Sequence, residues 1–271
     1  MVPQAKRVDF HLHTCRSDGR FTPDEVLARC ARAGLEVVAL TDHDLASDVA
    51  GEVHYEGRPI HVVPGAEVSG MHAGHEYHLL VYFPNGVPAA FRDFCAEQVR
   101  ARVERYANAV RNLGLPNLAP PGEEAIRGDV ALTRHHLARA LVAAGHARDM
   151  RDAFARFAGE STKHVPAVPM QFLDAIASAR RCGGLTSWAH PPLLALEKHL
   201  GVFVEAGLQG VEGVRPGLTS HDRRTYRKAA QRYGLYLTGG SDWHGWHEDG
   251  PGLFSADPAE LRGFFEALQA A

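Results

Sequence analysis

Short apolar runs alternate with helical patterns along most of this chain, and this alternation is typical of an α/β architecture. Strand and helix alternating over 271 residues fit a (β/α) barrel, for which about 250 residues is typical. The apolar runs predict seven strands, at Val8–His13, Val37–Leu40, Ile60–Val63, Tyr77–Phe83, Leu185–Trp188, Gly210–Val214 and Leu235–Thr238.

Capping sequences predict where two of the helices begin. Thr-Pro-Asp-Glu at 22–25 offers a capping hydroxyl, a first-turn proline and a carboxylate that returns to the cap, so we expect a helix that stops at Gly34. Asp-Pro-Ala-Glu at 257–260 is a second such box and predicts the start of the last helix. Further helical patterns cover Met170–Arg181, Leu193–Ala206 and Asp222–Tyr233.

The middle of the chain lacks a convincing strand. Residues 88–165 carry helical patterns and Pro/Gly breaks, so we expect a barrel formed by 1–87 and 166–271 with 88–165 as a helical insertion subdomain. For the four arginines of its first helix, a solvated face is the simpler interpretation and guidance of an anionic substrate is the alternative. These are Arg100, Arg102, Arg105 and Arg111.

Composition narrows the class of protein. Lys and Arg total 29 against 32 Asp and Glu, which argues weakly against a broad nucleic-acid or membrane surface. The four cysteines are far apart, so we expect reduced thiols rather than disulfides. Neither a signal peptide nor a long apolar span is evident, so we expect a cytoplasmic protein with no membrane contact and no obligate protein partner.

Seventeen histidines are spread along the chain, and many stand beside carboxylates where the predicted strands end. In a parallel barrel, residues just after successive strands meet at one mouth. Crowding so many ionisable groups there would be costly without compensating cations, so the pattern predicts a site for two or three divalent ions. The nine candidate ligands are His11, His13, Asp18, His43, Glu67, His78, His190, Asp242 and His244.

Six motifs in this order resemble the PHP (polymerase and histidinol phosphatase) superfamily: His-x-His, Ser-Asp-Gly, Thr-Asp-His-Asp, Gly-x-Glu, Ala-His-Pro and Gly-Ser-Asp-x-His. The likeness is to its stand-alone phosphoesterases, which include nucleoside 3′,5′-bisphosphate phosphatases and a 5′-to-3′ exoribonuclease. It implies a distorted (β/α)7 barrel with three divalent metal ions, most commonly manganese. Mixed imidazole and carboxylate ligands are also compatible with iron or zinc.

The resemblance also implies a role for each ligand. One ion would be held by His11, His13, Glu67 and Asp242, and a second by Glu67, His78 and His190, with Glu67 bridging. The third would be held by Asp18, His43 and His244. Asp42 matches a family position of catalytic importance, and we interpret it as a support for the ligands rather than a ligand.

Part of the insertion resembles the family as well. Family members often carry Arg-Pro-His where this chain has Arg134, His135 and His136. The resemblance implies that Arg134 faces the substrate phosphate and that His136 lies beside it. His164 stands where an aromatic residue is usual and is expected to contact the substrate, and His221 is the expected leaving-group acid.

These observations favour a metal-dependent phosphatase in which a metal-bound hydroxide attacks the phosphate of a small nucleotide, such as 3′-phosphoadenosine 5′-phosphate. Exonuclease action from 5′ to 3′ on short single-stranded RNA or DNA and hydrolysis of histidinol phosphate are the enzymatic alternatives. A metal-stabilised binding module predicts missing ligands, whereas all nine are present here. A metal-dependent amidohydrolase would usually add a bridging lysine, which the matching strand end lacks.

Overall fold

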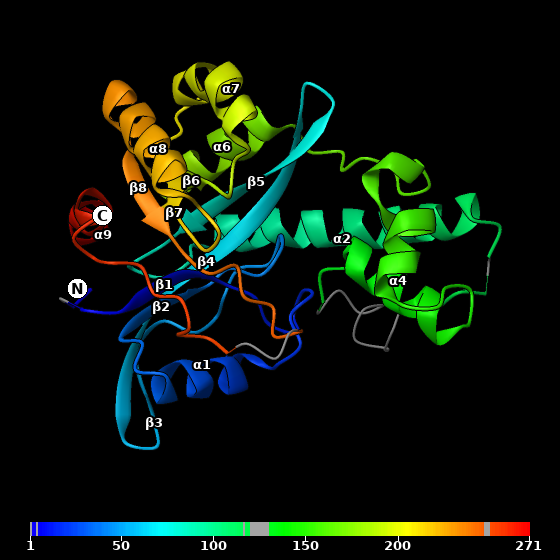
Figure 1. Cartoon of the computed structure of the whole chain (residues 1–271), viewed down its shortest axis with the longest axis horizontal. Helices are drawn as coiled ribbons and strands as arrows, with labels where there is room; N and C mark the ends of the chain where they lie inside the picture. The colour runs from blue at the N-terminus through cyan, green and yellow to red at the C-terminus, as the bar shows by residue number, and fades with distance from the viewer. Residues whose placement is uncertain (1, 4, 116, 120–129, 247–249) are drawn as a thin grey trace.

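The computed structural model describes residues 2–3, 5–115, 117–119, 130–246 and 250–271. Its centre is an eight-stranded sheet in the order β1-β2-β4-β5-β6-β7-β8, with β3 paired to the outer part of β4 (Figure 1). The strands are β1 (Val8–Leu12), β2 (Val37–Leu40), β3 (Gly51–Tyr55), β4 (Arg58–His72), β5 (His75–Tyr82), β6 (Leu185–Trp188), β7 (Gly210–Val214) and β8 (Tyr236–Gly239).

The sheet closes into a distorted barrel. Neighbouring strands are parallel except for β3, which runs antiparallel to β4, and β5, which runs antiparallel to both β4 and β6. Closure comes from the segment after β8, where Asp242 donates its backbone N–H to His11 and Trp243 accepts one from His13. The expected distorted α/β barrel and all seven predicted strands are therefore confirmed. Strand β3 was not predicted, and β4 and β5 form a hairpin longer than their apolar runs.

The helices surround this sheet and extend away from it. They are α1 (Pro23–Arg32), α2 (Ala89–Asn112), α4 (Arg134–Ala143), α5 (Met150–Ala153), α6 (Phe172–Arg181), α7 (Leu193–Glu205), α8 (Ser220–Tyr233) and α9 (Arg262–Ala270). Figure 1 shows α6, α7 and α8 grouped on one side of the sheet and α1 on the opposite side. Among the described residues, no helix combines the length and apolarity that crossing a membrane requires.

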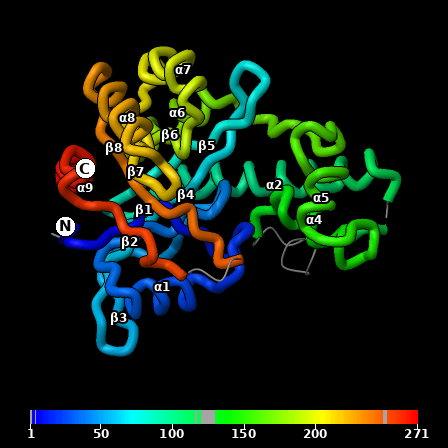
Figure 2. The backbone as a smooth tube through the Cα atoms, in the orientation of Figure 1, coloured from blue at the N-terminus to red at the C-terminus, as the bar shows by residue number. Residues whose placement is uncertain are grey.

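Helix α2 links two hydrophobic cores. Phe91 and Cys95 in its first turns pack into the barrel core, whereas Tyr106 and Val110 near its end pack into a second cluster with Leu137 of α4. Figure 2 shows the helix running from behind the strands out to α4 and α5. The division at 88 and 165 remains a prediction, but the second core consists only of residues from within that range.

The second predicted capping box does not begin the last helix. Asp257 instead closes a turn, accepting N–H groups from Ala259 on its side chain and from Glu260 on its backbone, and α9 begins at Arg262. The Glu260 carboxylate binds Arg227 at 3.0 Å rather than returning to the cap. The prediction was wrong because a capping box needs that return contact.

The closure of the barrel supplies a stability test at Gly240. A Cβ at this position would lie 2.5 Å from the backbone nitrogen of His11 in β1. A backbone atom within a strand cannot relieve this clash by rotating away, as a flexible side chain could. We expect Gly240→Ala to lower the free energy of unfolding by about 1–3 kcal/mol, measured by urea denaturation. Gly250→Ala is the matched control, because a Cβ there meets no atom within 4 Å. Equal stabilities for the two variants would contradict this closure.

Candidate metal centre and substrate cavity

The ends of β1 and of the barrel strands beside it carry the predicted ligands to one place. His11 lies in β1 and His13 follows it directly; both are fully buried, and their Nε2 atoms are 3.1 Å apart. Asp242 reaches the same point from beyond β8, with its Oδ1 3.3 Å from His11 Nε2 and 3.2 Å from His13 Nε2. Its backbone has a φ of 55°, a strained conformation of the kind found at functional sites.

Glu67 lies at the centre of the cluster. It stands in the middle of β4 rather than at its end, and its side chain is 1% exposed. The two carboxylate oxygens approach nitrogens of five imidazoles at 3.0–3.4 Å. The five are His11, His13, His43, His78 and His190.

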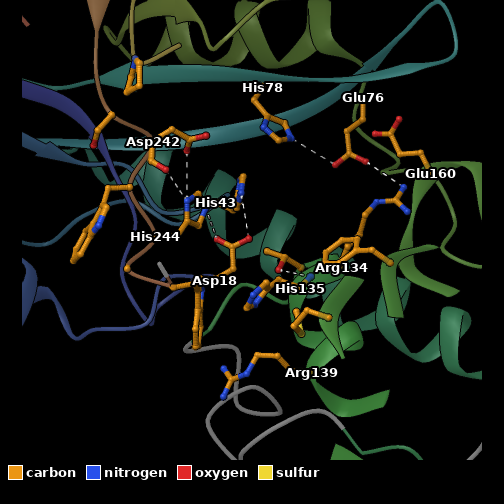
Figure 3. A pocket seen from close by; sticks show the side chains of 18 of the residues that line it. Asp18, His43, Glu76, His78, Arg134, His135, Arg139, Glu160, Asp242 and His244 are labelled. Carbon is orange, nitrogen blue, oxygen red and sulfur yellow. Dashed lines mark hydrogen bonds and ion pairs between the residues drawn. The ribbon is translucent and has the colours of Figure 1, made fainter. Parts of the chain in front are cut away.

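Asp18 organises the outer part of the cluster, where the cavity begins (Figure 3). Its Oδ1 lies 3.2 Å from His244 Nε2 and its Oδ2 lies 3.6 Å from His43 Nε2. The turn after β1 places Asp18, and the loops after β2 and β8 place the two histidines.

Within the part of the chain that the structure describes, potential ligand atoms form three groups in which each atom lies within 4.8 Å of the others. The groups are His11, His13, Glu67 and Asp242; His13, Asp18, His43 and His244; and His43, Glu67 and His78. The first is the set that the resemblance implies for one ion. The other two groups differ from the implied sets. His43, rather than His190, lies with Glu67 and His78, and His13 joins the group of Asp18. His190 is not in a group, although its Nε2 is 3.0 Å from Glu67 Oε1.

The hydrogen bonds around the cluster show that cations fit it. His11 donates from Nδ1 to Glu212 at 2.9 Å, and His13 directs its Nδ1 to the Ser17 hydroxyl at 3.4 Å. The two Nε2 lone pairs therefore face each other, which is favourable only around a cation. Glu67 Oε2, Asp18 Oδ1 and His43 Nδ1 are likewise buried with no hydrogen bond among the described residues.

Burial and charge shift the pKa values within the cluster in opposite directions. Burial lowers the pKa of His43 well below its usual value. Burial also lowers the pKa of His13 and His78, but nearby carboxylates, Glu67 among them, outweigh it and raise each pKa to about 10. Despite burial, the surrounding imidazoles hold the pKa of Glu67 well below its usual range. The central carboxylate is thus charged and suited to bind divalent cations.

Asp42 supports the cluster without entering it. Its carboxylate accepts three hydrogen bonds, from the Thr14 backbone N–H at 2.8 Å, the Thr14 hydroxyl at 2.7 Å and the Ser17 hydroxyl at 2.6 Å. Since Ser17 in turn accepts from His13, Asp42 orients a candidate ligand through one intermediate. The support role of Asp42 remains a prediction.

Two supporting carboxylates were not predicted. Glu212 in β7 is fully buried, binds His11 and also accepts the His190 backbone N–H at 2.8 Å. Asp9 in β1 accepts N–H groups from His11 and Ser241, and burial raises its pKa to about 7. The sequence did contain a signal for both residues: each is an acidic residue inside a predicted buried strand. Acidic residues are rarely buried unless they are paired.

A cavity of about 1130 Å³ separates the ligand cluster from the helical insertion (Figure 3). On the barrel side its wall includes His43, His78 and Asp242. On the insertion side its wall includes Arg102, Arg105, Arg134, His135 and Arg139. The cavity therefore has cationic side chains on the wall formed by the insertion and candidate metal ligands on the wall formed by the barrel.

Glu76 of β5 holds two of these arginines beside the cluster. Its Oε2 lies 2.7 Å from Arg105 and 3.8 Å from Arg134, and its Oε1 lies 3.9 Å from His78 Nε2. Burial would raise the pKa of Glu76, but His78 and Arg105 lower it well below its usual range. Arg134 is fixed further by donating to the Ala158 carbonyl at 2.9 Å.

The interpretation of the α2 arginines as a solvated face was wrong for two of the four. Arg100 and Arg111 are exposed, but Arg102 and Arg105 are buried. Arg102 pairs with Asp44 at 2.6 Å and donates to the Ser69 hydroxyl. The burial arises because this side of α2 lies between the barrel and the insertion, where an unpaired arginine would be costly.

The other predicted substrate residues lie apart from the described cavity wall. His136 is buried and caps α4 by accepting the Thr133 N–H, and burial lowers its pKa to about 4. His164 is partly buried and its carbonyl accepts from Asn112. His221 is exposed in the first turn of α8. None of the three is among the described residues that line the cavity, whereas Arg134 is.

The role of Glu212 supplies a test of the metal centre. A glutamine has one acceptor oxygen and cannot serve both His11 Nδ1–H and the His190 N–H as well as the carboxylate does. We expect Glu212→Gln to weaken metal affinity about 10- to 100-fold, measured by titration of the metal-free protein with Mn²⁺. Glu266→Gln, on the exposed side of α9, is the control. Unchanged affinity in Glu212→Gln would show that this carboxylate does not position a ligand.

Comparison with known proteins identifies the family. Residues 9–91 match the PHP domain. The chain is 29% identical to the 5′-3′ exoribonuclease Rnm of Salmonella typhimurium, over 96% of this chain and 93% of the relative. It is 29% identical to a 3′,5′-nucleoside bisphosphate phosphatase of Chromobacterium violaceum, over 90% and 89%. It is 31% identical to a phosphoribosyl 1,2-cyclic phosphate 1,2-diphosphodiesterase of Eggerthella lenta, over 88% and 94%.

Solved structures agree on the fold. A protein from Chromobacterium violaceum, described as an amidohydrolase with bound sulfate and no metal, superposes with a TM-score of 0.78 at 28% identity, covering 97% of this chain and 96% of its own. The relatives named as phosphatase, exoribonuclease and phosphodiesterase all hydrolyse phosphate esters. The chain therefore belongs to the PHP family and is a metal-dependent phosphoester hydrolase.

Proposed function

We propose that this protein removes the 3′-phosphate from nucleoside 3′,5′-bisphosphates such as 3′-phosphoadenosine 5′-phosphate, with three divalent ions, most commonly Mn²⁺. The observation that carries this proposal is the pair Arg105 and Arg134, held beside His78 by Glu76 where the ligand cluster meets the cavity. A substrate with one phosphate at the cluster and a second phosphate in the cavity would meet cationic groups at both positions.

Divalent ions in this cluster would lower the pKa of bound water toward neutrality and offset the charge on the phosphoryl oxygens. The nine candidate ligands would hold these ions, with Glu67 shared between groups. Asp42 and Glu212 would keep the imidazoles of His13 and His11 in the orientation that presents Nε2.

Arg134 is proposed to bind a phosphate oxygen of the substrate. Its side chain is 19% exposed and lines the cavity, so its guanidinium is accessible while its position is fixed by the Ala158 carbonyl. Glu76 balances this charge before substrate arrives. A guanidinium offers phosphate two parallel N–H groups, which gives both attraction and orientation.

The proposed machinery does not include His136, His164 or His221, because they do not line the described cavity wall. Among the described residues, His135, next to Arg134, does line this wall. The centroid of its ring lies 4.8 Å from that of Trp246. A cytoplasmic location and the absence of an obligate protein partner also belong to this proposal.

Exonuclease action from 5′ to 3′ on short RNA is the second candidate, supported by the relatives that are named exoribonucleases. The two reactions break the same bond. In both, the bond between phosphorus and the 3′-oxygen of a nucleoside 5′-phosphate breaks. The substrates differ at another oxygen of this phosphate, which carries no group in the bisphosphate and carries the next nucleoside in RNA. A cavity of about 1130 Å³ is larger than a histidinol phosphate would need, which favours a nucleotide.

Substrate choice is tested by incubating Mn²⁺-loaded protein with 3′-phosphoadenosine 5′-phosphate, histidinol phosphate and a 5′-phosphorylated RNA pentamer. We expect release of inorganic phosphate from the bisphosphate and none from histidinol phosphate, measured by a phosphate assay. Stepwise release of mononucleotides from the pentamer, measured by chromatography, would establish the second activity. Hydrolysis of histidinol phosphate alone would refute the nucleotide assignment.

The role of Arg134 is tested by Arg134→Ala. Loss of a partly buried guanidinium that binds phosphate is expected to reduce kcat/KM for the bisphosphate by the equivalent of about 2–5 kcal/mol, mainly through KM. Metal content, measured by atomic emission, should not change. The control is Arg148→Ala, because the Arg148 side chain is 85% exposed in the insertion. Equal kinetics for the two variants would remove Arg134 from the phosphate site.

A further inference from the structure

A second cavity reaches the ligand cluster from the side of α7. It has a volume of about 500 Å³ and shares Glu76, His78 and Glu160 with the wall of the substrate cavity. His190 lines this second cavity but not the first. The two cavities therefore adjoin each other at the candidate ligand His78.

Contacts with Glu67 show how close the second cavity lies to the proposed chemistry. His78 Nδ1 is 3.1 Å and His190 Nε2 is 3.0 Å from the same Glu67 oxygen, Oε1. Both imidazoles are part of the second cavity's wall. A phosphorus atom bound at the cluster would thus lie next to both the substrate cavity and the second cavity.

The wall of the second cavity suits a nucleoside. Much of it is apolar, with Tyr77, Ala189, Pro192 and Ala195 on it. Leu194 also lines it and is 84% exposed, so its side chain is accessible to a ligand. Lys198, one turn along α7, adds an exposed cation. Two carboxylates also lie on this wall: Glu76 pairs with Arg105 at 2.7 Å, and Glu160 interacts electrostatically with Arg134.

We propose that the second cavity binds the nucleoside that is attached through its 5′-oxygen to the scissile phosphate of an RNA strand, and that Lys198 contacts the next phosphate. This inference rests on the proposed function. A bisphosphate has no group at that position, so it would use the substrate cavity alone. A strand would use both cavities and cross the ligand cluster.

The reaction balances in the same way for both substrates. The oxygen of water forms a bond to phosphorus, and the bond from phosphorus to the 3′-oxygen of the terminal nucleotide breaks. The 3′-oxygen takes a proton and departs as the hydroxyl of a nucleoside 5′-phosphate. With a strand, the phosphate stays on the nucleoside in the second cavity, which becomes the new 5′ end. With a bisphosphate, it departs as inorganic phosphate.

The test compares second-cavity variants on three substrates: 3′-phosphoadenosine 5′-phosphate, a 5′-phosphorylated dinucleotide and a 5′-phosphorylated RNA pentamer. Leu194→Ala removes the exposed apolar contact without disturbing the core, and Ala195→Trp fills the cavity. We expect each to lower kcat/KM for dinucleotide and pentamer about tenfold, the effect of one lost apolar contact. Hydrolysis of the bisphosphate should stay within about twofold.

Lys198→Glu separates the phosphate contact from the nucleoside contact. It should lower kcat/KM for the pentamer about tenfold at low salt and less at high salt, because the contact is electrostatic. The dinucleotide, which lacks the next phosphate, should be little affected. The controls are Val202→Ala, at an exposed position on α7, and Lys228→Glu, an equal charge change on α8.

Three outcomes would overturn the inference. The first is that Leu194→Ala and Ala195→Trp both leave pentamer cleavage unchanged. The second is that they reduce bisphosphate and pentamer hydrolysis equally, because the cavity would then not distinguish the substrates. The third is that the wild-type protein hydrolyses the bisphosphate but not RNA, in which case the proposed function stands and the inference fails. A wild-type protein inactive on all three substrates would refute the proposed function itself.

Discussion

One buried carboxylate, Glu67, sets the conditions for the rest of this site. It contacts five imidazoles with its two oxygens, and those imidazoles come from strands and loops far apart in the sequence. Carboxylate oxygens and unprotonated imidazole nitrogens are all electron-pair donors, so their close approach is favourable when cations lie among them. The barrel brings these groups together because the ends of β1 and β2 and the loops after β6 and β8 meet the middle of β4 and β5, where Glu67 and His78 lie.

The groups behind the ligands explain how this arrangement is held. Glu212 joins β7 to the imidazole of His11 and to the backbone of His190, so one carboxylate ties two ligands to the barrel wall. Asp42 acts through Ser17 on the imidazole of His13. Both fix which nitrogen carries the proton, and this determines which nitrogen is left for a metal ion.

The insertion supplies the opposite wall, and α2 connects it rigidly to the barrel. The helix packs into both hydrophobic cores, so Arg102 and Arg105 cannot move independently of the ligand cluster. Glu76 then links Arg105 and Arg134 to His78. The proposed phosphate site and the candidate metal ligands therefore share one network of charges, and the second cavity begins at the same residues.

The sequence alone determined seven of the eight strands, the order of the ligand motifs and the need for cations, because apolar runs and strand-end residues are local patterns. It did not reveal the pairing partners of charged groups. The burial of Arg102 and Arg105, the use of Glu212 and Asp9 behind the ligands, and the turn at Asp257 depend on residues distant in the chain. His221 and Arg134 carried equally plausible motifs, yet Arg134 alone faces the cavity. Only the tertiary structure decides such outcomes, because the free energy of a charged side chain depends on which groups surround it after folding.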